Sequence, residues 1–296
     1  MSSKVLTSVH YGGIIYEELN AAVQCCDKDR RRAMDKLVVT DLSKTFGTSA
    51  VLHNVDFTVK EGEFLSILGP SGCGKTTILR ILIGLETPDS GSVLKDGVEI
   101  THLPPSERGM GIVFQNYALF ENMTVLGNIE YALKLKKETK ADARERAMHM
   151  LEIMGLSEHI NKKPHKLSGG QQQRVAIART LALKPDIILF DEPMSALDVD
   201  TRMTLRSELK HIQKEFGTTM IYITHDQEEA FAMSDRIMVM DAGYIHQLDT
   251  PQNIIDAPAD DYVRSFVIKN IQLKINSLIQ FVSDNTAKAV GDDGRN

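Results

Sequence analysis

One glycine-rich segment of the sequence has the residue types and spacing that bind phosphate. Residues 69–76 read Gly-Pro-Ser-Gly-Cys-Gly-Lys-Thr and fit a phosphate-loop pattern at every fixed position. The glycines let backbone N–H groups surround phosphate oxygens, while Lys75 can reach the outer phosphates and Thr76 can hold Mg²⁺. A plain glycine-rich turn is the alternative. A strand candidate at 64–68 and a helix candidate at 78–85 flank the segment and favour phosphate binding.

Two carboxylates follow an apolar run further along the chain. Residues 187–190 are Ile-Ile-Leu-Phe, and Asp191 and Glu192 come next. A buried strand here would deliver both groups to the edge where open α/β sheets bind ligands. Asp191 would then hold Mg²⁺ through water, and Glu192 would polarise an attacking water molecule. A strand that ends in a solvated acidic turn is the alternative, and the phosphate loop makes it the weaker one.

A serine and two glycines in residues 167–171, Leu-Ser-Gly-Gly-Gln, form a third motif. Ser168 and Gln171 have the spacing of a capping box, which predicts the start of a helix. A helix start with free N–H groups, two glycines and a hydroxyl also attracts anions, and capping alone does not need Gly169 and Gly170 together. Both interpretations can hold at once.

Together these motifs resemble the ATP-binding cassette (ABC) ATPases, and the resemblance extends from about residue 37 to 250. It implies that the serine and glycines of the 167–171 motif contact the γ-phosphate of an ATP molecule that the phosphate loop of a second subunit holds. It also implies that Gln115 senses Mg²⁺ and the attacking water, and that His225 contacts the γ-phosphate. A surface position for the glutamine and a structural role for the histidine are the alternatives.

The resemblance assigns two further positions and a set of site residues. Asp198 matches the loop that couples two ATP sites, unless it only caps a helix, and Phe46 matches the aromatic residue that stacks on adenine, unless it is an ordinary strand aromatic. The catalytic residues would be Glu192, His225, Gln115 and Lys75, and the metal ligands would be Thr76, Gln115 and Asp191. The nucleotide-binding residues would be Phe46, Gly69, Pro70, Ser71, Gly72, Cys73, Gly74, Lys75, Thr76, Thr77, Ser168, Gly169, Gly170, Gln171 and Asp198.

The elements that must position these residues alternate between strand and helix. Strand candidates are short apolar or alternating runs, at 37–39, 55–59, 64–68, 187–190, 220–223 and 237–240. Helix candidates carry an apolar stripe or lie between strands, at 78–85, 125–133, 143–154, 175–183, 205–216 and 228–233. The alternation predicts an α/β fold with a mostly parallel core sheet and an inserted α-helical lobe. The resemblance implies a P-loop NTPase of the ABC type with an N-terminal antiparallel β subdomain.

Composition excludes several classes of protein. The 296 residues carry 34 Lys and Arg against 40 Asp and Glu, a net charge of −6, which argues against a nucleic-acid partner. The uncharged stretch at 109–120 is too short to span a membrane, and no apolar run predicts a secretory signal. Three cysteines form neither a disulfide framework nor a metal pair, which is typical of a reducing cytosol. Cys73, at a predicted helix N-terminus, is expected to favour the thiolate and to react with a maleimide, unless it only fills a slot for a small residue and does not react.

Three classes of function fit an ABC cassette: the energy subunit of a membrane transporter, a soluble non-transport ATPase that acts on nucleic acid or ribosomes, and a module that binds ATP without turnover. Long heptad segments, CxxC pairs and a second cassette, which mark the soluble classes, do not occur in this sequence. Glu192 and His225 are present, which argues for hydrolysis. Transport is therefore favoured, with a head-to-tail dimer of this chain bound peripherally at the cytoplasmic face of the cell membrane.

Without a spanning segment, the chain would need separate permease subunits, an organisation that resembles bacterial importers fed by an extracytoplasmic substrate-binding protein. Residues 115–128 resemble the groove of importer cassettes that receives a permease helix. Tyr117, Leu119, Phe120 and Met123 suit such a groove, unless they pack internally.

The substrate is expected from resemblance alone. Residues 103–120 resemble the group that serves polyamines, ferric iron, sugars and 2-aminoethylphosphonate, and the short ending at 266–275 ranks 2-aminoethylphosphonate first. Ferric iron and polyamine are the alternatives.

Three segments are expected along the chain. Residues 1–33 have no counterpart in the resemblance, which favours a true start at Met34, with a real N-terminal arm as the alternative. If AGG or AGA codons encode the arginines at 30–32, these residues are a translated ribosome-binding tract. Residues 34–250 would be the ABC ATPase domain, with the helical lobe at about 116–180. Residues 251–296 would be a short C-terminal helix and tail instead of a full regulatory domain.

Overall fold

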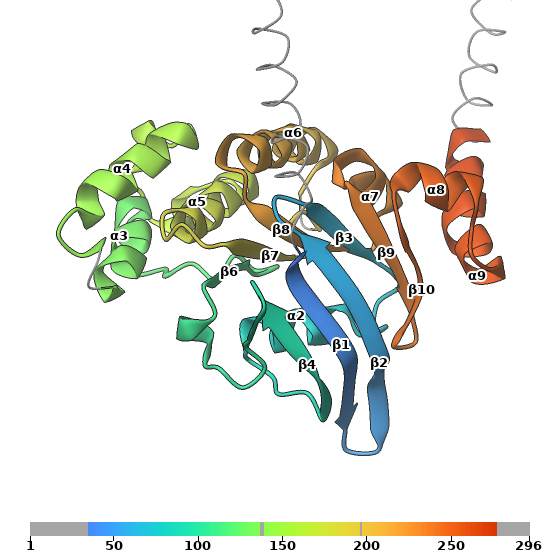
Figure 1. The fold of residues 1–296 in the computed structure, drawn as a ribbon. Coiled ribbons are helices and arrows are strands. Elements are labelled where there is room, and N and C mark those ends of the chain that lie inside the picture. Colours follow the sequence, from blue (N-terminus) through green and yellow to red (C-terminus); the bar gives the residue numbers. More distant parts are fainter. Residues whose placement is uncertain (1–34, 137–138, 196, 277–296) are drawn as a thin grey trace, which may run out of the picture.

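The expected parallel sheet forms the centre of the computed structural model, which describes residues 35–136, 139–195 and 197–276 (Figure 1). In sheet order its six strands are β10 (Tyr244–Asp249), β9 (Arg236–Asp241), β3 (Phe64–Leu68), β8 (Thr219–Thr224), β7 (Ile187–Asp191) and β6 (Met110–Val113). Neighbours run parallel, except that β10 joins the edge as an antiparallel hairpin with β9. The α/β fold and the mostly parallel sheet are therefore confirmed.

The strand order brings the predicted site residues to one edge of the sheet. Strands β3, β7 and β8 are buried along almost their whole length, as expected of strands covered on both faces. At their carboxyl ends β3 leads into residues 69–76, β7 delivers Asp191 and Glu192, and β8 delivers His225. The neighbouring strand β6 ends just before Gln115.

A second sheet is antiparallel and forms the β subdomain that the resemblance implies. Its strands, drawn from blue to green in Figure 1, are β2 (Ser49–Lys60), β1 (Asp35–Phe46), β4 (Ser90–Lys95) and β5 (Val98–Glu99). The hairpin of β1 and β2 is much longer than the runs expected at 37–39 and 55–59. Shifts of register along the pair and left-handed backbone at Asp41 and Asn54 interrupt the alternation, so the sequence pattern breaks although the hairpin continues.

Several helices begin before the apolar patterns that predicted them. Caps and glycines, rather than apolar residues, define the N-termini of these helices. Helices that contact the central sheet or flank its site edge include α2 (Lys75–Ile83), α5 (Gly169–Leu181), α6 (Val199–Phe216) and α7 (Gln227–Met233).

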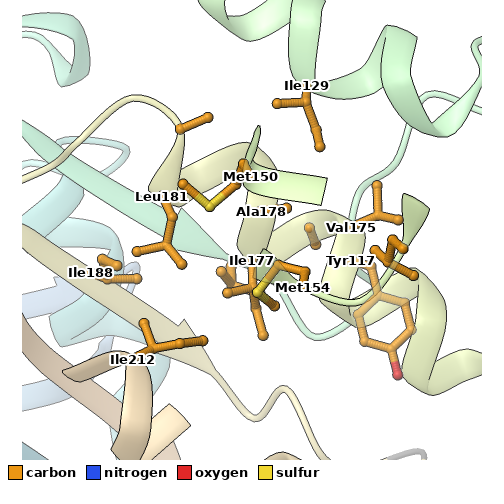
Figure 2. Close-up of a cluster of buried hydrophobic side chains, with 14 of the residues drawn as sticks. Tyr117, Ile129, Met150, Met154, Val175, Ile177, Ala178, Leu181, Ile188 and Ile212 are labelled. Carbon is orange, nitrogen blue, oxygen red and sulfur yellow. The ribbon is translucent and has the colours of Figure 1, made fainter. Parts of the chain in front are cut away.

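The predicted helical lobe shares one core with the central sheet. Its elements are α3 (Val125–Leu135), α4 (Ala143–Ile153), the short turns η3 (Ser157–His159) and η4 (Pro164–Lys166), and α5. Met150 and Met154 at the end of α4 lie in one buried cluster with Val175 of α5, Ile188 of β7 and Ile212 of α6 (Figure 2). Helix α5 begins at the 167–171 motif, which we call the signature motif. This helix therefore forms the junction between the lobe and the sheet.

The described part of the chain finishes with short helices on the far edge of the sheet. These elements are α8 (Pro251–Asp256), α9 (Asp261–Val263) and a π-helical turn η5 (Arg264–Lys269). Ile254, Val263 and Val267 pack with Leu68 of β3 and Val239 of β9. The predicted extension 1–33, the start at Met34 and the tail beyond residue 276 lie outside the described residues. Within the described part, no helix is long and apolar enough to cross a membrane.

A buried arginine fixes the C-terminal end of α2. Arg108, which follows the short turn η1 (Pro105–Glu107), is only 2% exposed. Its guanidinium donates to Ile81 O and Leu82 O at 2.6 and 3.0 Å, and to Thr101 O and Leu103 O, each at 2.8 Å. Burial lowers the pKa of Arg108, and none of the described carboxylates pairs with it. The cation is instead placed against the negative end of the helix that begins in the phosphate loop.

We expect Arg108→Met to destabilise the fold by about 3 kcal/mol, because it leaves buried carbonyl groups without donors. Urea unfolding measures this loss. The matched control is Arg144→Met, since the Arg144 side chain is 73% exposed and its pairing with Glu130 is a surface contact. A loss at Arg108 no greater than at Arg144 would show that the clamp contributes nothing to stability.

Candidate active site

The phosphate-loop segment forms a turn between β3 and α2, and the backbone of this turn lies close to β2. Gly72 and Gly74 have left-handed backbone, with φ of 84° and 106°. A Cβ atom at Gly74 would lie 2.7 Å from Leu52 Cδ2 and 2.9 Å from Val51 O. Because α2 has no side-chain cap at its start, its first N–H groups are free to bind an anion.

Lys75 lies inside this turn. Its side chain is 4% exposed, and its Nζ donates to Gly69 O and Pro70 O, each at 2.8 Å. Glu192 Oε1 is 3.9 Å from the same Nζ. The loop's own carbonyls therefore hold the ammonium group at the place where outer phosphates are expected.

Oxygen ligands suited to Mg²⁺ meet beside the lysine. Thr76 Oγ1 donates to Asp191 Oδ1 at 3.1 Å, and both residues line one cleft of about 340 Å³ with Gln115 and Glu192. Burial raises the pKa of Asp191, although the hydrogen bond from Thr76 opposes that shift. A hydroxyl, a carboxylate and an amide form a donor set that fits a hard divalent cation.

Glu192 is held in a strained conformation next to His225. The Glu192 backbone has φ of 44°, a left-handed value that costs about 1–2 kcal/mol outside glycine. Its Oε2 lies 2.9 Å from His225 Nδ1. The histidine is half exposed and faces the carboxylate, and its contact with the γ-phosphate stays a prediction. Strain of this kind is concentrated at functional sites.

The structure adds Ser195 to the predicted residues. Gln115 Nε2 donates to Ser195 Oγ at 3.0 Å, and Ser195 Oγ donates to Glu192 O at the same distance. The serine therefore joins the glutamine loop to the carboxylate loop. Ser195 precedes the predicted residue Asp198 by three positions, but its contacts depend on two strands that only the sheet brings together.

The turn that follows Gln115 is also strained. Tyr117 and Ala118 are both left-handed, with φ of 62° and 45°, at about 1–2 kcal/mol each. Arg179 of α5 donates to Tyr117 O at 3.0 Å and to Ala118 O at 2.7 Å. Hydrogen bonds from a charged donor contribute about 1.5–3 kcal/mol, enough to offset the strain. No sequence motif pointed to Arg179.

Tyr117 corrects one prediction for the permease groove. Its side chain is buried in the core of the lobe, with its hydroxyl 3.9 Å from the position of a Cβ atom on Gly169. Leu119 also packs against that core, and Met123 is half-buried. The internal alternative is therefore right for Tyr117 and Leu119, because the left-handed turn directs Tyr117 inward.

Phe120 does line an apolar groove. The groove has a volume of about 600 Å³, with walls from the end of α2, the η1 turn, β6, α3 and α5. Phe120 and Tyr131 are exposed in it and meet edge to face, with centroids 5.1 Å apart. Its apolar walls suit the face of a partner helix.

The signature motif lies away from the phosphate loop of its own chain. Ser168 and Gln171 form the predicted capping box, with N–H donors at 3.3 and 3.0 Å. Ser168 and Gly170 line a separate cleft of about 280 Å³ with residues of α6. Asp198 caps α6, where the backbone N–H and hydroxyl of Thr201 hold the pKa of its carboxyl low. Capping is therefore observed for Ser168 and Asp198, and the contacts of these two residues with nucleotide stay predictions.

Phe46 is partly exposed at the tip of the β1–β2 hairpin, with Lys44 Nζ 5.0 Å from its ring centroid. The lining of the phosphate-loop cleft includes Val51 of the same hairpin instead. Val51 is a position that the sequence did not single out. Stacking of Phe46 on adenine stays a prediction.

Comparison with known proteins agrees with this geometry. The family described as ABC transporter matches residues 52–195. The spermidine/putrescine import ATP-binding protein PotA of Bacillus cereus is 49% identical over 238 residues, which are 80% of this chain and 73% of the relative. The chain belongs to the ABC transporter ATPases.

Other relatives of the cassette carry the same description. The PotA proteins of Marinobacter nauticus and Oleidesulfovibrio alaskensis are 45% and 50% identical, over 87% and 76% of this chain. The cassette spans only 66% and 61% of the length of these two relatives.

A solved ABC structure shares the fold. It is a dimeric ATP-binding cassette in a post-hydrolysis state with ADP and Pi, 37% identical, with a TM-score of 0.66 over 73% of this chain and 98% of its own. The expected P-loop NTPase fold of the ABC type is confirmed. None of these relatives supports the first-ranked substrate, 2-aminoethylphosphonate.

Cys73 corrects a second prediction. The sequence favoured a reactive thiolate at the start of α2, but the side chain is 4% exposed, and burial raises the pKa of its thiol although Lys75 opposes the shift. A Cβ atom on Gly69 would come within 2.8 Å of Cys73 Sγ, so the sulfur fills a tight space inside the turn. The helix dipole favours a thiolate only where the sulfur is accessible.

We therefore expect Cys73 to resist maleimide in the folded cassette and to react fully in denaturant. The measurement is mass-spectrometric labelling of a variant in which Cys25 and Cys26 are replaced by Ser, so that Cys73 is the sole thiol. Rapid labelling of the folded variant with loss of ATPase activity would restore the original prediction.

Proposed function

We propose that this cassette hydrolyses ATP with Mg²⁺ and drives the import of a polyamine through separate permease subunits. The observation that carries the proposal is the convergence of the phosphate loop, Asp191, Glu192 and Gln115 on one cleft, with His225 next to Glu192. These groups come from the ends of four neighbouring strands.

Each group has a defined part in the proposed reaction. The free N–H groups of α2 and Lys75 would bind the outer phosphates. Thr76, Asp191 and Gln115 would hold Mg²⁺, which when bound neutralises phosphate charge. Glu192 would accept a proton from the attacking water. The His225 imidazole, whose Nδ1 is 2.9 Å from Glu192 Oε2, would orient the carboxylate. The remaining phosphate-loop residues, Phe46, Gln171 and Asp198 keep the nucleotide-binding roles that the resemblance implies.

The proposed working unit is a head-to-tail dimer. Ser168 and Gly170 line a cleft that shares no lining residue with the phosphate-loop cleft of the same chain. A second copy that faces the first would bring each signature helix start, with its positive end, to the γ-phosphate on the partner. The related dimeric cassette supports this arrangement.

The apolar groove beside Gln115 is the proposed contact with the permease at the cytoplasmic face of the membrane. Exposed aromatic and aliphatic side chains form its walls, and polar groups contribute little. A short amphipathic helix of a membrane subunit could bury its apolar face there. An extracytoplasmic binding protein would then act on the complex through the permease.

Polyamine replaces 2-aminoethylphosphonate as the proposed substrate class. Three relatives named for spermidine/putrescine import are 45–50% identical to this chain. The cassette itself has no part in substrate recognition in this proposal, so the relatives carry the argument.

We expect Glu192→Gln to keep ATP binding and to lower kcat at least about a hundredfold, because the amide cannot accept the proton of the attacking water. The trapped ATP should stabilise a dimer, measured by size-exclusion chromatography with Mg²⁺-ATP. Glu145→Gln, an exposed change on α4, is the control. Normal turnover in Glu192→Gln would assign the base elsewhere.

Labelled spermidine tests the substrate. The chain is co-expressed with candidate polyamine permease subunits and their binding protein in a bacterium deficient in polyamine uptake. We expect accumulation of spermidine that Glu192→Gln abolishes. Uptake of 2-aminoethylphosphonate or ferric iron in place of spermidine would contradict the assignment.

A further inference from the structure

Arg179 contacts two functional features that lie far from it in the sequence. Its Nη1 and Nη2 donate to Ala118 O and Tyr117 O, three and two residues after Gln115. Its Cζ lies 5.6 Å from the ring centroid of Phe120, inside the apolar groove. The residue itself belongs to α5, the helix that begins at the signature motif.

The surroundings of Arg179 are those of a clamp and not of a surface ion pair. Among the described residues, no carboxylate forms an ion pair with it. Burial lowers the pKa of the guanidinium, whose charge is met by two carbonyl dipoles and an aromatic face. The planar fork of an arginine donates to the two carbonyls from two different nitrogens in a fixed geometry, which the single ammonium nitrogen of a lysine cannot reproduce.

The carbonyls that Arg179 holds belong to a conformation that needs support. Tyr117 and Ala118 are consecutive left-handed residues without the freedom of glycine. If the clamp opens, this turn can relax toward ordinary backbone. Gln115 would then move, because Tyr117 N is bonded to Phe114 O across the glutamine.

The other contact of Arg179 faces the groove. Phe120 is 40% exposed and packs edge to face on Tyr131 of α3. A helix seated in the groove would touch this ring and would desolvate the guanidinium beneath it. A displacement of the ring therefore changes the surroundings of Arg179 directly.

We propose that Arg179 is the positioning residue through which the groove and the Mg²⁺ side of the ATP site sense each other. This inference rests on the proposed function for the roles of Gln115 and the groove. Because coupling between two sites is reciprocal, ATP binding must be felt at Phe120 as well as the reverse. The coupling can therefore be measured without a permease.

The natural chain has no tryptophan, so Phe120→Trp places a single fluorescent reporter in the groove. In a Phe120→Trp, Glu192→Gln background we expect Mg²⁺-ATP to shift the emission. Arg179→Lys should remove most of the shift, because the link between Gln115 and Phe120 is then broken. Arg144→Lys, the same change at an exposed position on the lobe, should keep it. ATP affinity and Tm are measured for each variant to show that it remains folded.

A second measurement uses hydrolysis in chains that keep Phe120 and Glu192. Arg179→Lys should lower kcat with KM for ATP changed less than about twofold, as expected when only positioning is lost. The double variant Arg179→Lys, Gln115→Ala should have a kcat little lower than that of Gln115→Ala alone, because both changes break the link between Arg179 and the Gln115 turn.

Three results would overturn the inference: no emission shift with Arg179 present, a full shift in Arg179→Lys, or additive losses with Gln115→Ala. The proposed function and the coupling can fail separately. If the emission shift is full with Arg179 and lost in Arg179→Lys, but the chain with Glu192 binds ATP without hydrolysing it, the proposed function is refuted and the coupling stands.

Discussion

The backbones of the phosphate loop, of β9 and of β2 approach one another closely, and the rest of this structure depends on this constraint. A Cβ atom on Gly69 would lie 2.4 Å from Met240 O of β9, and one on Gly74 would collide with β2. The turn thus lies where the antiparallel sheet meets the parallel one. Only glycine allows N–H groups to line an anion site while both sheets pack against its outer side. The two sheets cannot separate without opening the site.

The parallel strands bring the other groups of the proposed site to the phosphate loop. Because β6, β7, β8 and β3 end at the same edge, groups that are far apart in the chain become neighbours. Strain gathers at those ends, at Glu192 after β7 and at Tyr117 and Ala118 after β6. Hydrogen bonds from Ser195 and Arg179, and one from Glu192 N to Ile223 O of β8, hold these conformations. The sheet edge therefore carries loops whose left-handed conformations depend on hydrogen bonds from other elements.

Three cations near the site are satisfied by backbone carbonyls. Lys75 lies among the carbonyls of its own loop, Arg108 among those at the end of α2, and Arg179 on the turn after Gln115. Carbonyl dipoles hold the charges of Arg108 and Arg179 in place without cancelling them, as a carboxylate would, whereas Lys75 also has Glu192 Oε1 3.9 Å away. Carbonyl contacts of Lys75 and Arg108 thus anchor α2 at both ends.

The sequence by itself determined the features that local spacing defines: the phosphate loop, the capping box at Ser168, the buried strands and the alternation that gives the α/β fold. Tertiary structure decided the rest. The inward direction of Tyr117, the inaccessible thiol of Cys73 and the carbonyl partners of Arg179 depend on segments that are remote in the chain. Motif spacing sets local hydrogen bonds, whereas burial and long-range contacts arise only when sheets and helices pack.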